Sequence, residues 1–205
     1  MNFRKLLSQL NKYLQTLEIK LTSKQWKHIN FSDVTSLSMN KYYNSFLNET
    51  KLGNVKYNDN DRKVCSKKFK EFINNSLDNK VSLNVSKLSP YILVKEVIHN
   101  KLWNHNKETS YQRKLINKQW ETYVKSKNIY IKNIIPMIDL SHSMEKEKNK
   151  PLYTSIAMGI LISELNSNAF KNRILTFDSE PYWINLSEKD DFCEKVKKIN
   201  DRRWG

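Results

Sequence analysis

Ile134-Ile135-Pro136-Met137-Ile138 is an apolar run that ends in the polar turn Asp139-Leu140-Ser141-His142-Ser143. An apolar run of this length, without polar alternation, is typical of a strand buried on both faces of a parallel sheet. The following segment, 145–150, is charged and is predicted to be a loop. An apolar helix is predicted over 152–165.

Two further strands are predicted, over 173–177 and 182–186, followed by a helix over 190–200. The order β-α-β-β-α predicts an α/β sheet with a right-handed crossover. The helix at 152–165 is long enough for a parallel return, so strands 134–138 and 173–177 should pair in parallel. The short link before Tyr182 allows only a hairpin, which places strand 182–186 antiparallel at the outer edge.

Upstream of this stretch the sequence predicts only helices. The apolar residues from Phe3 to Leu21 recur every three or four positions, which predicts one amphipathic helix. Ser32-Asp33 is a plausible start for the next helix. The fold class is therefore a basic all-α region over 1–128, followed by an α/β domain over 129–205. The remaining expected elements are helices over 39–47, 64–77, 89–98 and 111–124, and loops over 51–62 and 100–109.

Positive charge is concentrated in the helical region. The chain has 205 residues and a formal net charge of +15, and residues 1–130 hold 24 Lys and Arg against 10 Asp and Glu. Such asymmetry favours a polyanionic partner, with RNA as the first candidate, for residues 1–128. The alternative is a solvated, Lys-rich helical surface. There are 30 Lys and only 6 Arg, which weakens the nucleic-acid interpretation because Arg is the preferred ligand of phosphates and bases. No individual nucleic-acid-binding residues are predicted.

Several protein classes are excluded by composition. Cys65 and Cys193 are far apart and four His are scattered, so neither a disulfide framework nor a His-rich metal site is expected. The N-terminus lacks a signal peptide, and no apolar run approaches the ~20 residues needed to cross a bilayer. These features predict an intracellular protein without a membrane partner.

The turn after the first predicted strand carries the only sequence motif that suggests a metal-binding or catalytic role. Asp139, Ser141 and Ser143 offer one carboxylate and two hydroxyl oxygens at alternate positions, just beyond the carboxyl end of a strand. Such oxygens are ligands for Mg²⁺. The alternative is a turn that caps a helix. A phosphatase would need a second Asp in place of Ser141, and a Ser hydrolase a Gly-x-Ser-x-Gly elbow. His142 should point away into solvent.

These residues resemble the start of a von Willebrand factor A domain, whose metal-ion-dependent adhesion site begins with Asp-x-Ser-x-Ser. The resemblance implies that 129–205 form an incomplete von Willebrand A-like, Rossmann-type α/β domain. Nearly the whole chain is similar to an uncharacterised family of plants and giant viruses, in which a basic helical region precedes such a domain. If the chain is viral, its expected location is the host cytoplasm. The resemblance includes the segments Trp26–Phe31, Leu88–Tyr91, Gln119-Trp120 and Phe170–Arg173. The architecture is more distantly similar to that of TROVE-module RNA-binding proteins.

The resemblance also implies what the chain lacks. A complete adhesion site takes a Thr and a second Asp from loops expected after residue 205, so this chain looks like an internal or truncated piece. Any Mg²⁺ site should therefore be weak. The unpaired edge of the first strand should attract a protein partner or the chain's own C-terminal half. Three functions remain open: a non-enzymatic interaction protein, a degenerate or split-gene fragment without activity, and a metal-dependent hydrolase.

Overall fold

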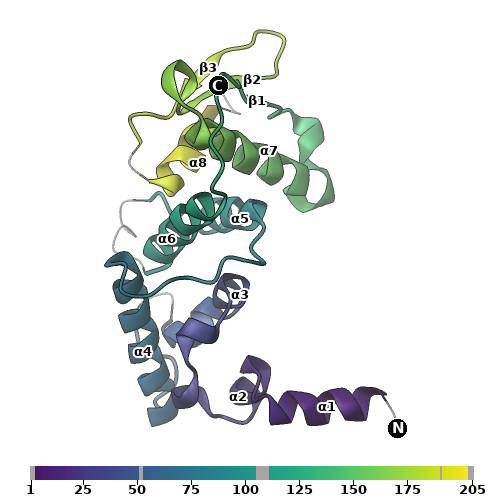
Figure 1. Ribbon diagram of the computed structural model, residues 1–205. Coiled ribbons are helices and arrows are strands. Elements are labelled where there is room, and N and C mark those ends of the chain that lie inside the picture. The colour runs from purple at the N-terminus through teal and green to yellow at the C-terminus, as the bar shows by residue number, and fades with distance from the viewer. Residues whose placement is uncertain (1–2, 51–52, 105–110, 190, 203–205) are drawn as a thin grey trace. The chain divides into compact units, whose positions relative to one another are not determined.

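The computed structural model describes residues 3–50, 53–104, 111–189 and 191–202 (Figure 1). It is mostly helical and contains one three-stranded mixed sheet, an α+β architecture in coarse terms. Packing divides the chain into two compact units, Met1–Ser86 and Lys87–Gly205, here called the first and second units. None of the helices in the described ranges is long and apolar enough to cross a membrane.

The first unit is entirely helical. Its elements are α1 (Phe3–Tyr13), α2 (Leu17–Thr22), the 3-10 turns η1 (Trp26–His28) and η2 (Phe31–Asp33), α3 (Ser36–Leu47) and α4 (Asn60–Leu77). Its core is aromatic because α3, α4 and η2 each contribute phenylalanine. The ring of Phe31 lies 5.1 Å from that of Phe46 and 4.9 Å from that of Phe69.

Two helix boundaries in this unit differ from expectation. The stripe over 3–21 does not form one helix, because the chain turns between α1 and α2, where Gln15 adopts φ 49°. No residue of α1 is buried, so packing does not hold the two segments in line. The start predicted at Ser32-Asp33 is also wrong, because these residues belong to η2. The side chain of Thr35 caps α3 instead, by accepting a hydrogen bond from the N–H of Ser38.

The second unit joins two helices to an α/β segment. Its elements are α5 (Pro90–Asn100), α6 (Tyr111–Ser126), β1 (Met137–Ile138), η4 (His142–Glu145), α7 (Lys146–Leu165), η5 (Asn168–Phe170), β2 (Arg173–Thr176), β3 (Trp183–Asn185) and α8 (Phe192–Asp201). The helices expected over 64–77, 89–98 and 111–124 are confirmed as α4, α5 and α6. Because α4 begins at Asn60, residues 60–62 of the loop expected over 51–62 are helical instead. Residues 51–52 of the expected loop over 51–62 and residues 105–109 of that over 100–109 lie outside the described ranges.

The sheet has the predicted topology. Its order is β1-β2-β3, with β1 parallel and β3 antiparallel to β2. Met137 pairs with Leu175, which in turn pairs with Trp183, so one residue from each strand forms a row across the sheet. The side chains of this row lie on one face of the sheet, and helix α7 covers the other face. It packs so closely that a Cβ on Gly159 would lie 2.6 Å from Cγ2 of Ile138.

The prediction that run 134–138 is buried on both faces is wrong. The strand itself is limited to β1, and Ile134, Ile135 and Met137 are 49%, 40% and 54% exposed. For Ile135 and Met137 the reason is that α7 covers only one face of the sheet, and within the described residues no helix packs on the other. Ile134 lies before the strand begins. The loop expected over 145–150 is also corrected, because α7 begins at Lys146 and contains Pro151 within its first two turns.

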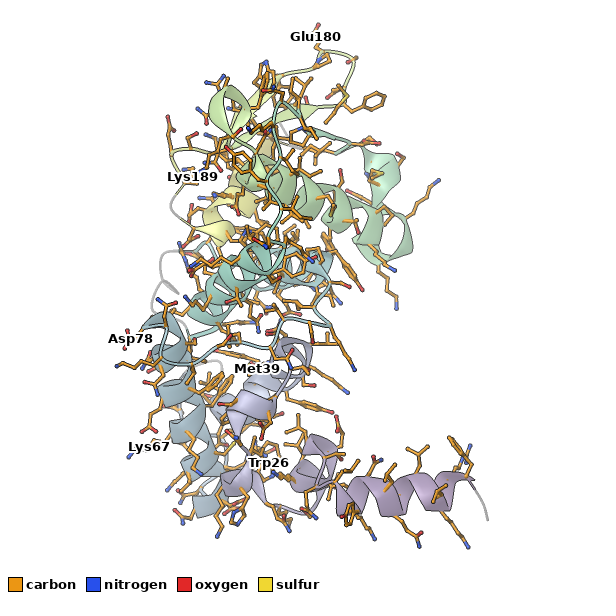
Figure 2. All side chains as sticks on the ribbon, in the orientation of Figure 1. Trp26, Met39, Lys67, Asp78, Glu180 and Lys189 are labelled. Carbon is orange, nitrogen blue, oxygen red and sulfur yellow. The ribbon has the colours of Figure 1, made fainter. Side chains whose placement is uncertain are left out.

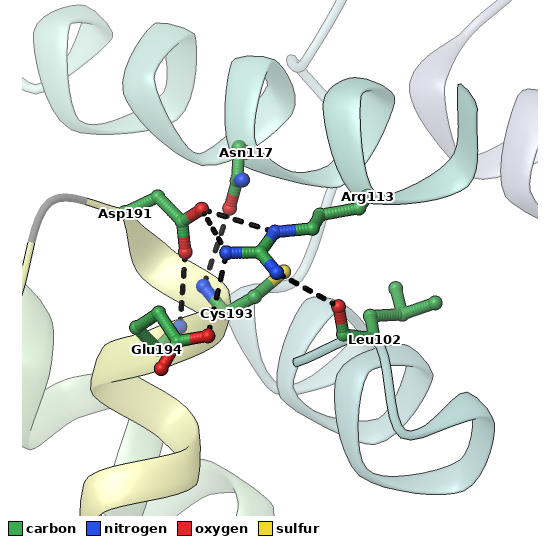
Figure 3. A network of polar contacts seen from close by, with 6 residues as sticks. All are labelled: Leu102, Arg113, Asn117, Asp191, Cys193 and Glu194. Carbon is green, nitrogen blue, oxygen red and sulfur yellow. Dashed lines mark hydrogen bonds and ion pairs between the residues drawn. The ribbon is translucent and has the colours of Figure 1, made fainter. Parts of the chain in front are cut away.

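Partly buried polar contacts hold α6 to the start of α8 (Figure 3). The guanidinium of Arg113 on α6 donates to Asp191 at 2.7 Å and to Glu194 at 3.3 Å. Asn117 on α6 accepts a hydrogen bond of 3.2 Å from the N–H of Cys193. Helices α5 and α6 therefore belong to the same compact unit as the sheet. The functional division expected at residue 128 stays a prediction, since packing places its own boundary after Ser86.

Candidate functional site

The Asp139 turn, residues 139–143, follows β1 directly and is held by its own side chains. The N–H of Ser141 donates to Oδ1 of Asp139 at 2.8 Å. The hydroxyls of Ser141 and Ser143 lie 2.7 Å apart, in hydrogen-bond contact. All three predicted ligands therefore lie within one turn, and both serines are exposed.

His142 is separate from these oxygens. Its side chain is 89% exposed, and Nδ1 lies 3.1 Å from a carboxylate oxygen of Glu145 in η4. The prediction that His142 faces solvent is confirmed. The position of His142 therefore gives no support for a role beside the oxygens of the Asp139 turn.

The turn is positioned by the packing beneath it. The N–H of Phe177 donates to the carbonyl of Ile138 at 2.8 Å, so the carboxyl ends of β1 and β2 lie side by side. Asp178 follows at this same end of the sheet and accepts a 2.7 Å hydrogen bond from the N–H of Ser179. Sequence reasoning did not select Asp178. Its place immediately after a strand was the available signal, because ligands of α/β sheets bind beyond the carboxyl ends.

The fit of a Mg²⁺ ion to the Asp139 turn is partial. The donor set is of the right kind, since carboxylate and hydroxyl oxygens suit a hard cation. However, the turn supplies only one carboxylate. The described residues also contain no group of three or more His, Cys, Asp or Glu side chains that could hold a metal ion. If a cation binds here, the serine hydroxyls must contribute.

A second candidate lies in the first unit, where η1 and η2 meet α4. A groove of about 490 Å³ opens there, here called the Lys27 groove. It is lined by Lys27, His28, Ile29, Asn30, Phe31, Lys68, Glu71, Phe72 and Asn75. Two lysines, a histidine and two asparagines surround it, with Glu71 as the single acid, so its lining favours an anionic, hydrogen-bonding ligand.

Contacts between η1 and α4 shape this groove. Asp61 at the start of α4 accepts hydrogen bonds from the N–H groups of Trp26 and Lys27, at 2.7 and 2.9 Å. Nζ of Lys68 donates to the carbonyl of Lys27 at 2.7 Å. The guanidinium of Arg62 stacks 3.5 Å from the ring centre of Trp26, which is labelled in Figure 2. The groove therefore depends on residues more than 30 positions apart.

The rest of α4 also presents lysines to solvent. Lys67, labelled in Figure 2, is 80% exposed, and its nitrogen lies 4.0 Å from Glu71. An exposed pair at this distance contributes little to stability, but its carboxylate still offsets the local positive charge. Lys70 is closer to its partner and forms an ion pair with Glu49. The basic surface of the first unit is thus partly neutralised, at Lys70 by Glu49 and beside the Lys27 groove by Glu71.

Comparison with protein families divides the chain in two. Residues 2–128 match a family described as a domain of unknown function, DUF2828. Residues 133–205 match a second domain of unknown function, DUF7788. The first match covers more than half of the chain.

A viral relative spans the same two regions. The chain is 27% identical over 206 residues to the uncharacterized protein L728 of Acanthamoeba polyphaga mimivirus. The match covers 99% of this chain and 33% of the relative, so the chain spans about a third of the length of that protein. No solved structure matches the chain.

Proposed function

The chain belongs to the DUF2828 family, a domain of unknown function, and on that premise we propose that it is a non-enzymatic interaction protein whose basic helical region binds RNA. The observation that carries this proposal is the Lys27 groove, within a region that holds 14 of the 15 net positive charges. The giant-virus relative is itself uncharacterised and names no activity.

The chemistry of the groove favours the sugar-phosphate backbone over base edges. Lysine acts as a point charge on phosphate, whereas reading a base usually requires the rigid fork of arginine. Asn30 and Asn75 add hydrogen-bonding groups to the groove. Binding of single-stranded RNA with little sequence preference is therefore expected, supported by charge and limited by the one acid, Glu71.

The test is salt-dependent binding of a mixed-sequence, single-stranded RNA by fluorescence anisotropy. The logarithm of the association constant should fall linearly with the logarithm of the salt concentration, because released counterions drive binding. Substituting Lys27→Gln with Lys68→Gln should reduce the slope by about 1.4, corresponding to two lost phosphate contacts. The matched control, Lys5→Gln with Lys12→Gln on α1, removes the same charge outside the groove and should change the slope less.

Two results would count against RNA binding in the groove. Affinity that is absent at low salt, or unchanged by salt, would remove the proposal. Equal losses in the groove variant and the α1 variant would leave only diffuse attraction to the whole basic surface. Circular dichroism of both variants controls for folding, because Lys68 also contacts the carbonyl of Lys27.

A second function is favoured by the geometry of the Asp139 turn, where the two hydroxyls and the carboxylate lie together. The resemblance to the A domain implies that Asp139, Ser141 and Ser143 would hold a Mg²⁺ ion through which a partner binds. Calorimetry with MgCl₂ should detect weak binding that Asp139→Ala abolishes and His142→Ala leaves unchanged. Tight binding would contradict the partial donor set, and binding that survives Asp139→Ala would exclude the turn.

A further inference from the structure

The outer edge of β1 has main-chain groups without a partner strand. The carbonyls of Pro136 and Ile138 accept hydrogen bonds of 2.9 and 2.8 Å from β2, and that of Ile134 accepts one from the side chain of Asn166. The main-chain carbonyls of these alternate residues thus point toward β2 and away from the outer edge. Because this direction alternates along an extended chain, Ile135, Met137 and Asp139 direct theirs to the outer edge. Within the described residues, β1 pairs with β2 alone.

This edge lacks the usual protection against pairing. Natural sheets block edges with proline, lysine or a bulge. Pro136 does not block this one, because its main chain faces β2. Ile134, Ile135 and Met137 are all at least 40% exposed, and Lys132 is the nearest upstream charge. The edge is therefore both open and apolar.

We propose that a second copy of this chain pairs with the outer edge of β1 in antiparallel orientation about a two-fold axis at Met137. Met137 then lies opposite Met137 of the second copy, and Ile135 opposite Asp139. All three outward-facing residues find main-chain partners in this register. The two sheets become one sheet of six strands.

The charges at the two ends of the sheet favour a second copy of the chain as the partner. They also favour antiparallel pairing. The parallel strands enter the sheet at a basic end, with Lys132, Lys171 and Arg173, and leave it at an acidic end, with Asp139, Asp178 and Glu180. An antiparallel two-fold places the basic end of each copy beside the acidic end of the other. A parallel arrangement would place like charges together.

Helix α7 can extend this interface beyond the strand edge. It contacts both β1 and β2 on one face of the sheet, so it lies above the space between them. With strands about 4.8 Å apart, the two α7 helices would lie about 10 Å apart, a distance at which helices pack. Met158, 40% exposed, lines an apolar groove of about 430 Å³ on this helix, together with Pro151 of α7 and Met144 of η4.

Sedimentation of the nuclease-treated full chain tests the proposal. The unsubstituted chain should sediment as a dimer at tens of micromolar. Met137→Lys should raise the dissociation constant at least tenfold, because two lysines would face each other across the axis. Trp183→Lys is the matched control, since Trp183 is 50% exposed on the same face but lies two strands from the edge. It should leave the dimer unchanged.

A monomer at all concentrations would overturn the proposal, as would a dimer that Met137→Lys leaves intact or that both variants weaken equally. A second measurement does not depend on how Met137→Lys folds. Met137→Cys should form a disulfide between copies when diamide is added, because opposed residues have Cα atoms about 5.5 Å apart. Trp183→Cys should not. Cys65 and Cys193 are fully buried and do not compete. Efficient cross-linking of Trp183→Cys but not Met137→Cys would exclude this register.

Discussion

The indole ring of Trp120 stacks on the ring of Phe192, with centroids 4.1 Å apart and planes inclined by 15°. Trp120 lies in the part of the chain that matches one family, and Phe192 in the part that matches the other. The indole N–H also donates to Glu164 on α7 at 2.9 Å. The boundary between the two families therefore passes through a packed core rather than through a linker between domains.

Fragments should show this dependence. A fragment of residues 87–205 is expected to give a cooperative thermal transition by circular dichroism. A fragment of residues 129–205 lacks α5 and α6 and exposes Phe192, so it should give none. A cooperative transition for the shorter fragment, equal to that of the longer one, would show that the α/β segment folds without these helices.

Arg113→Ala should destabilise the chain by about 2–4 kcal/mol, because it leaves Asp191 and Glu194 as partly buried carboxylates without their cation. The measurement is urea denaturation followed by circular dichroism. Lys125→Ala is the control, since Lys125 is 71% exposed and pairs with Glu121 at the surface. Its effect should stay below about 1 kcal/mol. Similar losses for both variants would mean that the Arg113 network contributes no more than a surface pair.

Gly159→Ala should destabilise the chain by about 1–3 kcal/mol, although alanine is the better helix former by about 1 kcal/mol. The reason is the 2.6 Å approach of the added Cβ to Ile138. In an Ile138→Ala background the obstruction is gone, so Gly159→Ala should become neutral or stabilising. Thermal melts of the unsubstituted chain, the two single variants and the double variant give the coupling free energy between the two positions. Additive effects would contradict close packing of α7 on β1.

Both cysteines should be unreactive in the folded chain. Burial raises the pKa of the Cys65 thiol to about 12, and burial followed by the nearby charge of Asp191 raises the pKa of the Cys193 thiol further. The reactive thiolate is therefore scarce at pH 8. Ellman's reagent should detect no thiol before denaturation and two after it. Rapid reaction of one thiol in the native chain would show that its helix opens readily.

Local sequence signals predicted much of this fold. Linker lengths correctly predicted the parallel and antiparallel pairings of β2, and Pro90 marked the start of α5. The spacing of Asp139, Ser141 and Ser143 was sufficient to predict that they share one turn, although their role as metal ligands stays a prediction. These features depend on residues close together in the sequence, which explains why they could be found there.

Other features depend on what packs nearby, which the sequence does not state. An apolar run such as 134–138 looks the same whether one face or two are covered, so the exposure of Met137 could not be predicted. The break at Gln15 has no glycine or proline to mark it. The Lys27 groove joins Lys27 to Lys68, 41 positions later, and only the tertiary structure brings them together.

Pro151 allows the first turn of α7 to open independently of the rest of the helix. Proline has no N–H, so the helix lacks one hydrogen bond between its first turn and the rest. Opening of the turn that begins at Lys146 therefore need not propagate into the buried stretch that carries Ile156 and Ile160. Amide hydrogens just before Pro151 should exchange through small local fluctuations, and those after it only through larger ones. The Asp139 turn thus adjoins a segment that can rearrange at low cost while the sheet beneath it stays intact.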